Sequence, residues 1–386
     1  MRPLLAVLVL MLATIIAARV AVAGEPTAPY PVSAAISGID FDFSTTIELA
    51  PGSDNWAITW GGDGHQYTTW GDGGGFGGTN TKGRVSLGVG RVEGDRDAYL
   101  GFNVWGGFEP ENPATFVGKS TGMLAIDLTL YLWRAGNGSG ASAFSFQELY
   151  RSDDLGATWN LTPVDYRPDD FPDSDGPFTF TFLQFGAGYS GARDTFVYAY
   201  GAENKDGNWN VQTPGEIALM RAPVASLENP ADWEFFAGLD GGDQPQWTQT
   251  PGARAPVFED PVNGVMRTSV SYNAGLERYL LITQQVNRFE SDNGHIGIYD
   301  APEPWGPWTT VLFANPWEIG LQDGGKTVYW NFSNKWLSAD GRQCVLVYTG
   351  SGSDEWGTVS CSFTLPGIFA DGFESGDAGA WDAAVP

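Results

Sequence analysis

The feature that most limits the fold of this chain is a long series of short, strand-like runs. From Ile36 onward, runs rich in Phe, Tyr, Trp, Val and Thr recur about every 8–15 residues, with turn residues between them. The chain holds 52 Gly and 24 Pro, which supply these turns. Long stretches with the period of an amphipathic helix are lacking. Roughly twenty strands suit an all-β sandwich, barrel or propeller, and they divide naturally into five four-stranded blades.

The two ends of the chain differ from this body. Residues 1–23 combine a basic second residue, an apolar run from Leu4 to Ile16 and the small residues Ala21-Val22-Ala23, which is the pattern of a signal peptide. The apolar run is shorter than the ~20 residues that a membrane span needs. We therefore expect a secreted chain, extracellular or periplasmic, with one propeller domain over residues 30–365 and no membrane span.

Residues 366–386 are short, acidic and rich in Gly and Ala. They resemble a "DGFESG…W" terminus found on exported bacterial proteins. We expect a flexible tail that serves sorting or surface retention.

Charge restricts the partners of this chain. Its net charge is −26, which argues against nucleic acid and anionic lipid as partners, because phosphate contacts demand basic patches. A neutral polysaccharide or oligosaccharide is compatible with this negative charge. Sixteen Trp are present, and exposed aromatic rings are common platforms for sugars, although many will be core. We expect a monomer.

The only cysteines are Cys344 and Cys361. Their midpoint falls in a Gly/Ser-rich loop, so they face each other across the last hairpin, and an exported chain permits a disulfide there. Two buried free thiols are the alternative. A catalytic cysteine is disfavoured, because His65 and His295 are the only histidines and neither lies near in sequence.

Residues 53–75 predict a β-hairpin with its turn at Asp63. Around that pivot, Asp54 faces Asp72 at a rim of tryptophans. Opposed residues have Cβ atoms about 4.5–5.5 Å apart, where like charges are unfavourable. A carboxylate pair for acid–base chemistry on a sugar would explain this placement. Solvated turn acids that never meet are the alternative, and a one-residue slip would separate the two.

Residues 152–159, Ser-Asp-Asp-Leu-Gly-Ala-Thr-Trp, resemble the Asp-box of sialidase-like propellers. The resemblance implies a propeller-type hairpin. It also implies a structural rather than catalytic role for Asp154.

Further motifs extend from about residue 50 to 350. They include Ser53-Asp54-Asn55-Trp56, Lys119 with Gly122-Met123-Leu124, Phe182-Leu183-Gln184-Phe185-Gly186, Gly191-Ala192-Arg193-Asp194 and Pro302-Glu303-Pro304-Trp305-Gly306-Pro307-Trp308. Together they resemble a family of five-bladed β-propellers that includes bacterial endo-D-arabinanases. The resemblance implies glycosidase chemistry on furanose-rich polysaccharide, with catalytic acids at Asp54 and Asp72. Ala187 departs from the pattern, because a longer polar or basic residue is expected there.

Six residues are expected to surround the sugar: Trp56, Trp70, Arg193, Asp194, Arg254 and Tyr272. An arginine would fix a hydroxyl group, and a third acid would tune its neighbours. An ordinary surface ion pair is the alternative for Arg193 and Asp194. Carboxyl groups about 5 Å apart would favour a retaining route, and about 6.5–9.5 Å an inverting one.

No metal or cofactor is expected. Asp169, Asp170, Asp173 and Asp175 could wrap Ca²⁺, but the complete calcium-loop spacing is absent, which favours a solvated acidic loop. The sequence also lacks a His/Cys cluster for zinc, a phosphate loop and a Gly-x-Ser-x-Gly elbow.

The sequence therefore predicts a secreted glycoside hydrolase that acts on a furanose-containing, arabinan-type polysaccharide through Asp54 and Asp72. Two alternatives stay open. One is a non-catalytic glycan-binding propeller, and the other is an acidic surface scaffold.

Overall fold

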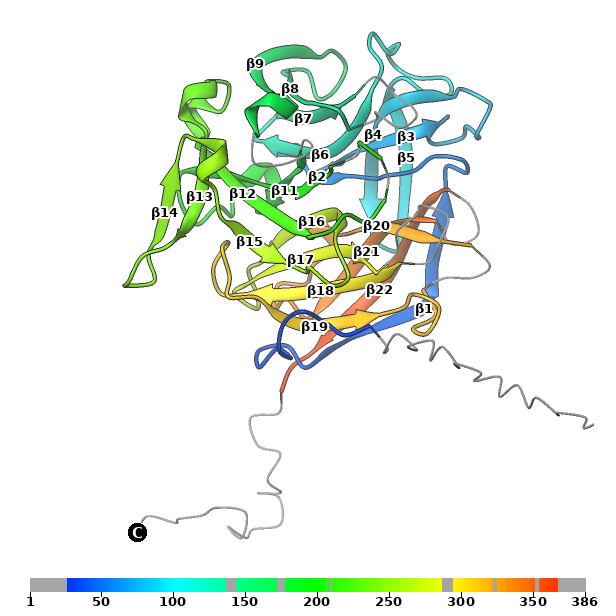
Figure 1. Cartoon of the computed structure of the whole chain (residues 1–386). Coiled ribbons are helices and arrows are strands. Elements are labelled where there is room, and N and C mark those ends of the chain that lie inside the picture. Colours follow the sequence, from blue (N-terminus) through cyan, green and yellow to red (C-terminus); the bar gives the residue numbers. More distant parts are fainter. Residues whose placement is uncertain are drawn as a thin grey trace, which may run out of the picture.

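The computed structural model describes residues 26–136, 144–171, 178–205, 207–208, 210–286, 294–321, 325–350 and 354–366 (Figure 1). Within these ranges the regular elements are strands β1 to β22 and six short 3-10 helices. The predicted all-β class is confirmed. The predicted signal peptide, nearly all of the predicted tail, and Asp173 and Asp175 lie outside the described residues.

Two sheets are antiparallel and follow the chain order strand by strand. The first contains β2 (Ile58–Trp60), β3 (Gln66–Gly73), β4 (Val85–Asp95) and β5 (Ala98–Trp105). The second contains β6 (Lys119–Ile126), β7 (Thr129–Ala135), β8 (Gln147–Ser152) and β9 (Asn160–Tyr166).

A larger sheet joins two further antiparallel groups. One group is β10 (Phe178–Gln184), β11 (Phe196–Glu203), β12 (Glu216–Pro223), β13 (Glu234–Leu239) and β14 (Pro245–Thr248), and β15 (Pro256–Glu259) pairs with β12. The other is β16 (Met266–Asn273), β17 (Arg278–Gln285), β18 (His295–Ala301) and β19 (Thr309–Ala314). A short parallel contact between β10 and β16 joins them, from Leu183–Val270 to Gln184–Ser271.

The last sheet brings the two ends of the described chain together (Figure 1). It contains β20 (Thr327–Phe332), β21 (Gln343–Gly350), β22 (Trp356–Thr364) and β1 (Gly38–Leu49), which pairs antiparallel with β22. Cys344 and Cys361 are directly paired across β21 and β22, with Cα atoms 4.8 Å apart, and they form a disulfide. The predicted disulfide is confirmed.

The first and last sheets are also held together by side chains. The hydroxyl group of Tyr99 in β5 lies 2.8 Å from Thr358 Oγ1 in β22 and accepts a hydrogen bond from the indole of Trp356. Burial raises the pKa of Tyr99 to about 12, although both hydrogen bonds act in the opposite direction. The hydroxyl therefore stays neutral and can serve both partners.

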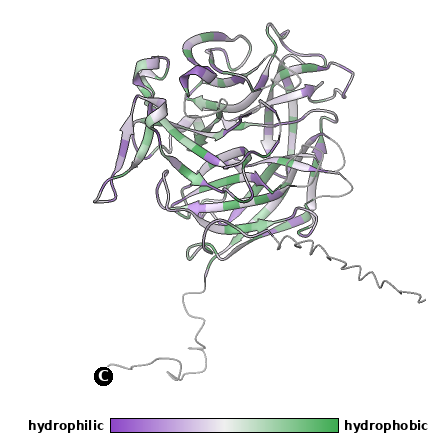
Figure 2. Ribbon diagram, in the orientation of Figure 1, coloured by the Kyte–Doolittle hydropathy of each residue, from purple (hydrophilic) through white to green (hydrophobic). Residues whose placement is uncertain are grey.

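Strands β2, β6, β10, β16 and β20, called the first strands below, each open one of the groups. Ile58, Met123, Phe182, Val270 and Phe332, one from each, line a common space. Hydrophobic residues concentrate on the strands, whereas the outlying β14 is hydrophilic (Figure 2). The first strands thus surround the centre of the molecule, and their two ends offer two separate places for a site.

The turn at residues 152–159 is built from short-range hydrogen bonds. Ser152 Oγ accepts from Gly156 N, and the Asp154 carboxylate accepts from Ser152 Oγ, Thr158 N and Thr158 Oγ1. Trp159 is buried and donates to Gly156 O at 3.0 Å. Asp154 is fully engaged by its own turn, in keeping with a structural role.

Candidate functional site

The register of the first hairpin decides where the two predicted acids lie. The expected pairs Ile58–Thr68 and Trp60–Gln66 are present, but Asp54 bridges Gly71 rather than Asp72. Asn55 adopts a left-handed φ of 55° between these pairs, and this extra residue shifts the register by one. The predicted pairing of Asp54 with Asp72 is therefore wrong.

Despite this shift in register, Asp54 and Asp72 both lie beside Gly71. A Cβ atom on Gly71 would lie 2.6 Å from Asp54 Oδ1 and 3.3 Å from Lys119 Nζ. The same Lys119 Nζ lies 2.6 Å from Asp72 Oδ1. Glycine is thus favoured at position 71, because a Cβ atom there would force the Asp54 carboxylate to move. The result is two carboxylates and one ammonium group around a bare stretch of backbone.

The three charged groups differ in exposure. The Lys119 side chain is 2% exposed and that of Asp72 is 33% exposed, while Asp54 is buried. Arg84 approaches Asp72 from the solvent side, with Nη2 3.4 Å from Oδ1, and donates from Nη1 to the Asp72 carbonyl. A buried ammonium group is stable only when it is paired, so Lys119 ties β6 to the end of β3.

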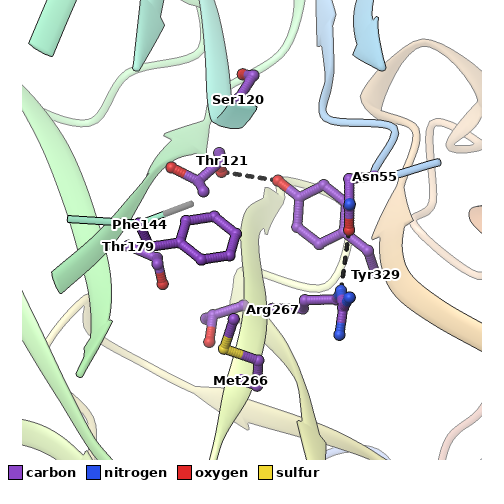
Figure 3. Close-up of a pocket in the computed structure, with 9 residues that line it drawn as sticks. Asn55, Ser120, Thr121, Phe144, Thr179, Met266, Arg267 and Tyr329 are labelled. Atoms are coloured by element: carbon purple, nitrogen blue, oxygen red, sulfur yellow. Dashed lines mark hydrogen bonds between the residues drawn. The ribbon is translucent and has the colours of Figure 1, made fainter. Parts of the chain in front are cut away.

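Asn55 and Ser120, the residues that follow Asp54 and Lys119, line a small pocket of about 20 Å³ (Figure 3). It lies where the first strands start, and its other lining residues are Thr121, Phe144, Thr179, Met266, Arg267, Thr268 and Tyr329. Arg267 donates from Nε to Asn55 Oδ1 at 2.9 Å and from Nη1 to Gln284 Oε1 at 3.0 Å. Tyr329 donates to Thr121 O at 2.8 Å.

One polar side chain of this pocket, that of Asn55, has an unsatisfied hydrogen-bond donor within the described part of the chain. Asn55 Nδ2 is buried and has no hydrogen-bond partner among the described residues. An amide N–H that lines a pocket can donate to a hydroxyl group of a ligand, and the cost of leaving it unpaired gives it a reason to do so.

The backbone around the pocket is unusual. Asn55, Asp72, Arg267 and Tyr329 have φ angles of 55°, 50°, 44° and 53°. Register shifts occur between Ser120 and Gly122 in β6, between Met266 and Ser269 in β16, and between Val328 and Asn331 in β20. Bulges re-aim side chains, and left-handed backbone at non-glycine residues concentrates at functional sites.

Two of the predicted sugar-binding residues are core residues. Trp56 and Trp70 are both 0% exposed. Their ring centroids are 5.6 Å apart, and Trp56 also packs edge-on against Trp356 at 5.3 Å. A fully buried indole has no face to offer a sugar, so the prediction of sugar stacking at these two positions is wrong.

Three other predicted residues lie at the opposite end of the first strands. Tyr272 comes five residues after Arg267 in β16, which places it about 16 Å further along the strand. Arg193 lies 5.4 Å from the Tyr272 ring centroid and 3.9 Å from a Glu303 oxygen. Asp194 accepts hydrogen bonds from Phe196 N and Tyr198 Oη. None of the three joins Asp54 and Asp72.

Arg254 lies at the same end of the first strands as the two acids, but it does not line the pocket. Its guanidinium lies 4.5 Å from the ring centroid of Phe178, the residue before the pocket-lining Thr179, and Nη1 donates to Pro251 O. The pKa of the neighbouring Glu216 is raised, first by burial and then by Glu203, although Arg254 acts to lower it.

Sequence reasoning missed the roles of Lys119, Arg267 and Tyr329. Lys119 carried a usable signal, since it is a rare cation in an acidic chain and opens an otherwise uncharged strand. Arg267 and Tyr329 carried none, because Arg267 bonds Asn55 across 212 residues of sequence and Tyr329 bonds Thr121 across 208.

The described residues contain no group of three or more His, Cys, Asp or Glu side chains placed to hold a metal ion. In the same part of the chain, no helix has the length and apolar character that crossing a membrane requires.

Fold and site together define an all-β chain with two carboxylates and a buried lysine beside a polar central pocket. This chain belongs to the family described as a domain of unknown function, DUF4185, whose match covers residues 121–347. Asp54 and Asp72 precede the matched residues. None of the curated proteins matches the sequence.

Solved structures give more distant likenesses. An α-L-arabinofuranosidase from Podospora anserina, solved with cellotriose, is 11% identical, with 87% of this chain and 97% of that chain covered and a TM-score of 0.46. An endo-arabinase from Bacteroides thetaiotaomicron is 11% identical, with 89% and 99% covered and a TM-score of 0.44. Likeness at this level carries no argument about what this chain does.

Proposed function

We propose that this chain is a secreted five-bladed β-propeller that hydrolyses glycosidic bonds in a furanose-containing, arabinan-type polysaccharide. Asp54 and Asp72 would share the chemistry. The observation that carries the proposal is the meeting of these two carboxylates with Lys119 at Gly71, next to the polar pocket.

The propeller assignment rests on the strand groups. Five antiparallel groups, each opened by one of the first strands, fit five blades around a central axis. The pairing of β1 with β22 would then close the ring by completing the last blade with the N-terminal strand. We also assign residues 152–159 as an Asp-box, because the Ser152 and Asp154 side chains accept hydrogen bonds from backbone N–H groups of a hairpin turn.

Glycoside hydrolysis needs two carboxyl groups in different roles. One protonates the leaving oxygen, and the other attacks the anomeric carbon or activates water. Asp54 is buried, whereas Asp72 is partly open to solvent and forms ion pairs with Lys119 and Arg84. Such unequal surroundings suit a pair that must divide the acid and base roles.

The remaining pocket residues suit a neutral polyol. Asn55 offers an unpaired amide N–H, and Arg267 is anchored by Asn55 and Gln284. Arginine and asparagine that are held in place can fix sugar hydroxyl groups without reorganising. The furanose assignment comes from the family resemblance of the sequence motifs, and export comes from residues 1–23 together with the disulfide.

Release of reducing ends from a panel of furanose polysaccharides tests the proposal. Wild-type protein is expected to release them, and Asp54→Asn and Asp72→Asn are each expected to lower kcat about 100- to 10,000-fold. Asp63→Asn is the matched control, because Asp63 lies at the turn of the same hairpin, away from the pocket. If wild type, both variants and the control all release the same background, the hydrolase proposal fails.

A further inference from the structure

A second cavity, of about 320 Å³, lies at the end of the molecule where the first strands finish. Trp60 at the end of β2, Tyr272 in β16, Ala187 after β10 and Asn334 after β20 all line it. Trp60 is six residues beyond Asp54, which corresponds to about 20 Å along an extended chain. This cavity is therefore separate from the pocket beside the acids.

The chemistry of the cavity is aromatic and neutral. Trp60 and Tyr272 are partly exposed, and the described lining residues include no charged side chain. Two buried polar atoms have no hydrogen-bond partner among the described residues, namely the donor Trp60 Nε1 and the acceptor Asn334 Oδ1. A ligand hydroxyl group can satisfy either of them, since it both donates and accepts.

We propose that this cavity binds one neutral sugar unit of a polysaccharide and acts as an accessory, non-catalytic site. Aromatic rings with a few convergent polar groups, in a hollow of about 300–1,000 Å³, are typical of small-ligand sites. A charged ligand would find no counter-charge in the lining, and a polyanion would be repelled by the net charge of −26. The inference rests on the proposed function for the choice of polysaccharide only.

Arg193 belongs to the rim of this site. It lies over the Tyr272 ring and donates to Tyr279 Oη and to Pro302 O. The Tyr272 ring also packs against Phe185 and Tyr279, with ring centroids 5.5 and 4.9 Å apart, and it stays partly exposed where it lines the cavity. Arg193 and Tyr272, which were predicted to bind sugar beside the acids, would then bind sugar at the other end of the molecule.

Ala187 offers a clean way to block the cavity. It begins the 3-10 helix Ala187–Tyr189, is partly exposed and lines the hollow with a methyl group. Ala187→Arg would place a long side chain in the space without removing any packing contact. Tyr272→Ala is the complementary variant, because it removes a ring face instead of adding bulk.

The test is calorimetric titration of an arabinofuranose oligosaccharide into the Asp54→Asn/Asp72→Asn double variant, which cannot consume the ligand. Two molecules bound per chain are expected. Adding Ala187→Arg should remove one of them, and adding Tyr272→Ala should weaken one at least tenfold. Trp317→Ala, at an indole that is 44% exposed and outside the cavity, is the matched control and should change nothing.

The outcomes separate this inference from the proposed function. One molecule bound by the parent and none after Ala187→Arg supports the accessory site, although the pocket beside the acids then binds no sugar. Unchanged stoichiometry and affinity in both Ala187→Arg and Tyr272→Ala overturns the accessory site, whatever the hydrolysis assay gives. Binding of a neutral proline-rich peptide in place of sugar overturns it as well.

Discussion

Lys119 pairs with Asp72, one of the two proposed catalytic acids, and the contribution of this pair can be measured. Its buried ammonium lies 2.6 Å from Asp72 Oδ1. Opposite charges at that distance attract by about 6 kcal/mol at an effective dielectric constant of about 20, and dehydration offsets much of this attraction. Breaking a fully buried pair costs about 3–5 kcal/mol. Because the Asp72 side chain is 33% exposed, we expect a coupling free energy of about 2–3 kcal/mol between the two residues.

A double-mutant cycle with Lys119→Met and Asp72→Asn measures this coupling by urea unfolding. Arg84 supplies the internal comparison, since it approaches the same carboxylate at 3.4 Å with a side chain that is 44% exposed. Arg84→Met paired with Asp72→Asn should give a coupling below about 1 kcal/mol. A Lys119 coupling no larger than that of Arg84 would refute the view that the buried lysine positions Asp72.

Two further predictions follow from the described contacts. Trp70→Ala should lower the free energy of unfolding by about 3–5 kcal/mol, because the side chain is fully buried; a loss below 1 kcal/mol in urea unfolding would contradict its place in the core. For Asp154, partial burial raises the pKa, but hydrogen bonds from Thr158 and Ser152 outweigh it, so the folded pKa lies below the unfolded one. Its stabilisation is therefore present above the unfolded pKa of about 3.9 and is lost as the pH falls through the folded pKa. Asp154→Asn should cost about 1 kcal/mol at pH 6 and less below pH 3, and thermal unfolding that shows the same difference at both pH values would contradict this.

Local patterns in the sequence were sufficient for the strands, the first hairpin turn and the disulfide. The turn at Asp63 sets the pairs Ile58–Thr68 and Trp60–Gln66 as predicted, because a tight turn fixes the register of the strands beside it. The same reasoning placed Cys344 opposite Cys361. In both hairpins the information lies within a few residues of the turn.

The site itself needed information that local patterns do not hold. The register shift between Asp54 and Ile58 comes from the left-handed backbone of Asn55, whose N–H donates to Thr349 Oγ1 near the far end of the chain. Trp56 and Trp70 could have been platforms or core, and only their packing decides between these roles: Trp56 against Trp356, and Trp70 against Trp56 and Phe76. Composition alone could not separate the two, since large aromatic rings serve both purposes.

The strained backbone links the fold to the proposed chemistry. A left-handed conformation at a non-glycine residue costs on the order of 1–3 kcal/mol, and glycine would meet the same demand without that strain. Yet Asn55, Asp72, Arg267 and Tyr329 all carry side chains there. Each side chain makes a specific contact at the pocket: Asn55 with Arg267, Asp72 with Lys119, and Tyr329 with Thr121. Tyr329 also packs in a hydrophobic cluster with Tyr67 and Met123, whereas the polar contacts of Asn55 and Asp72 suit the proposed site, which needs polar groups in fixed positions.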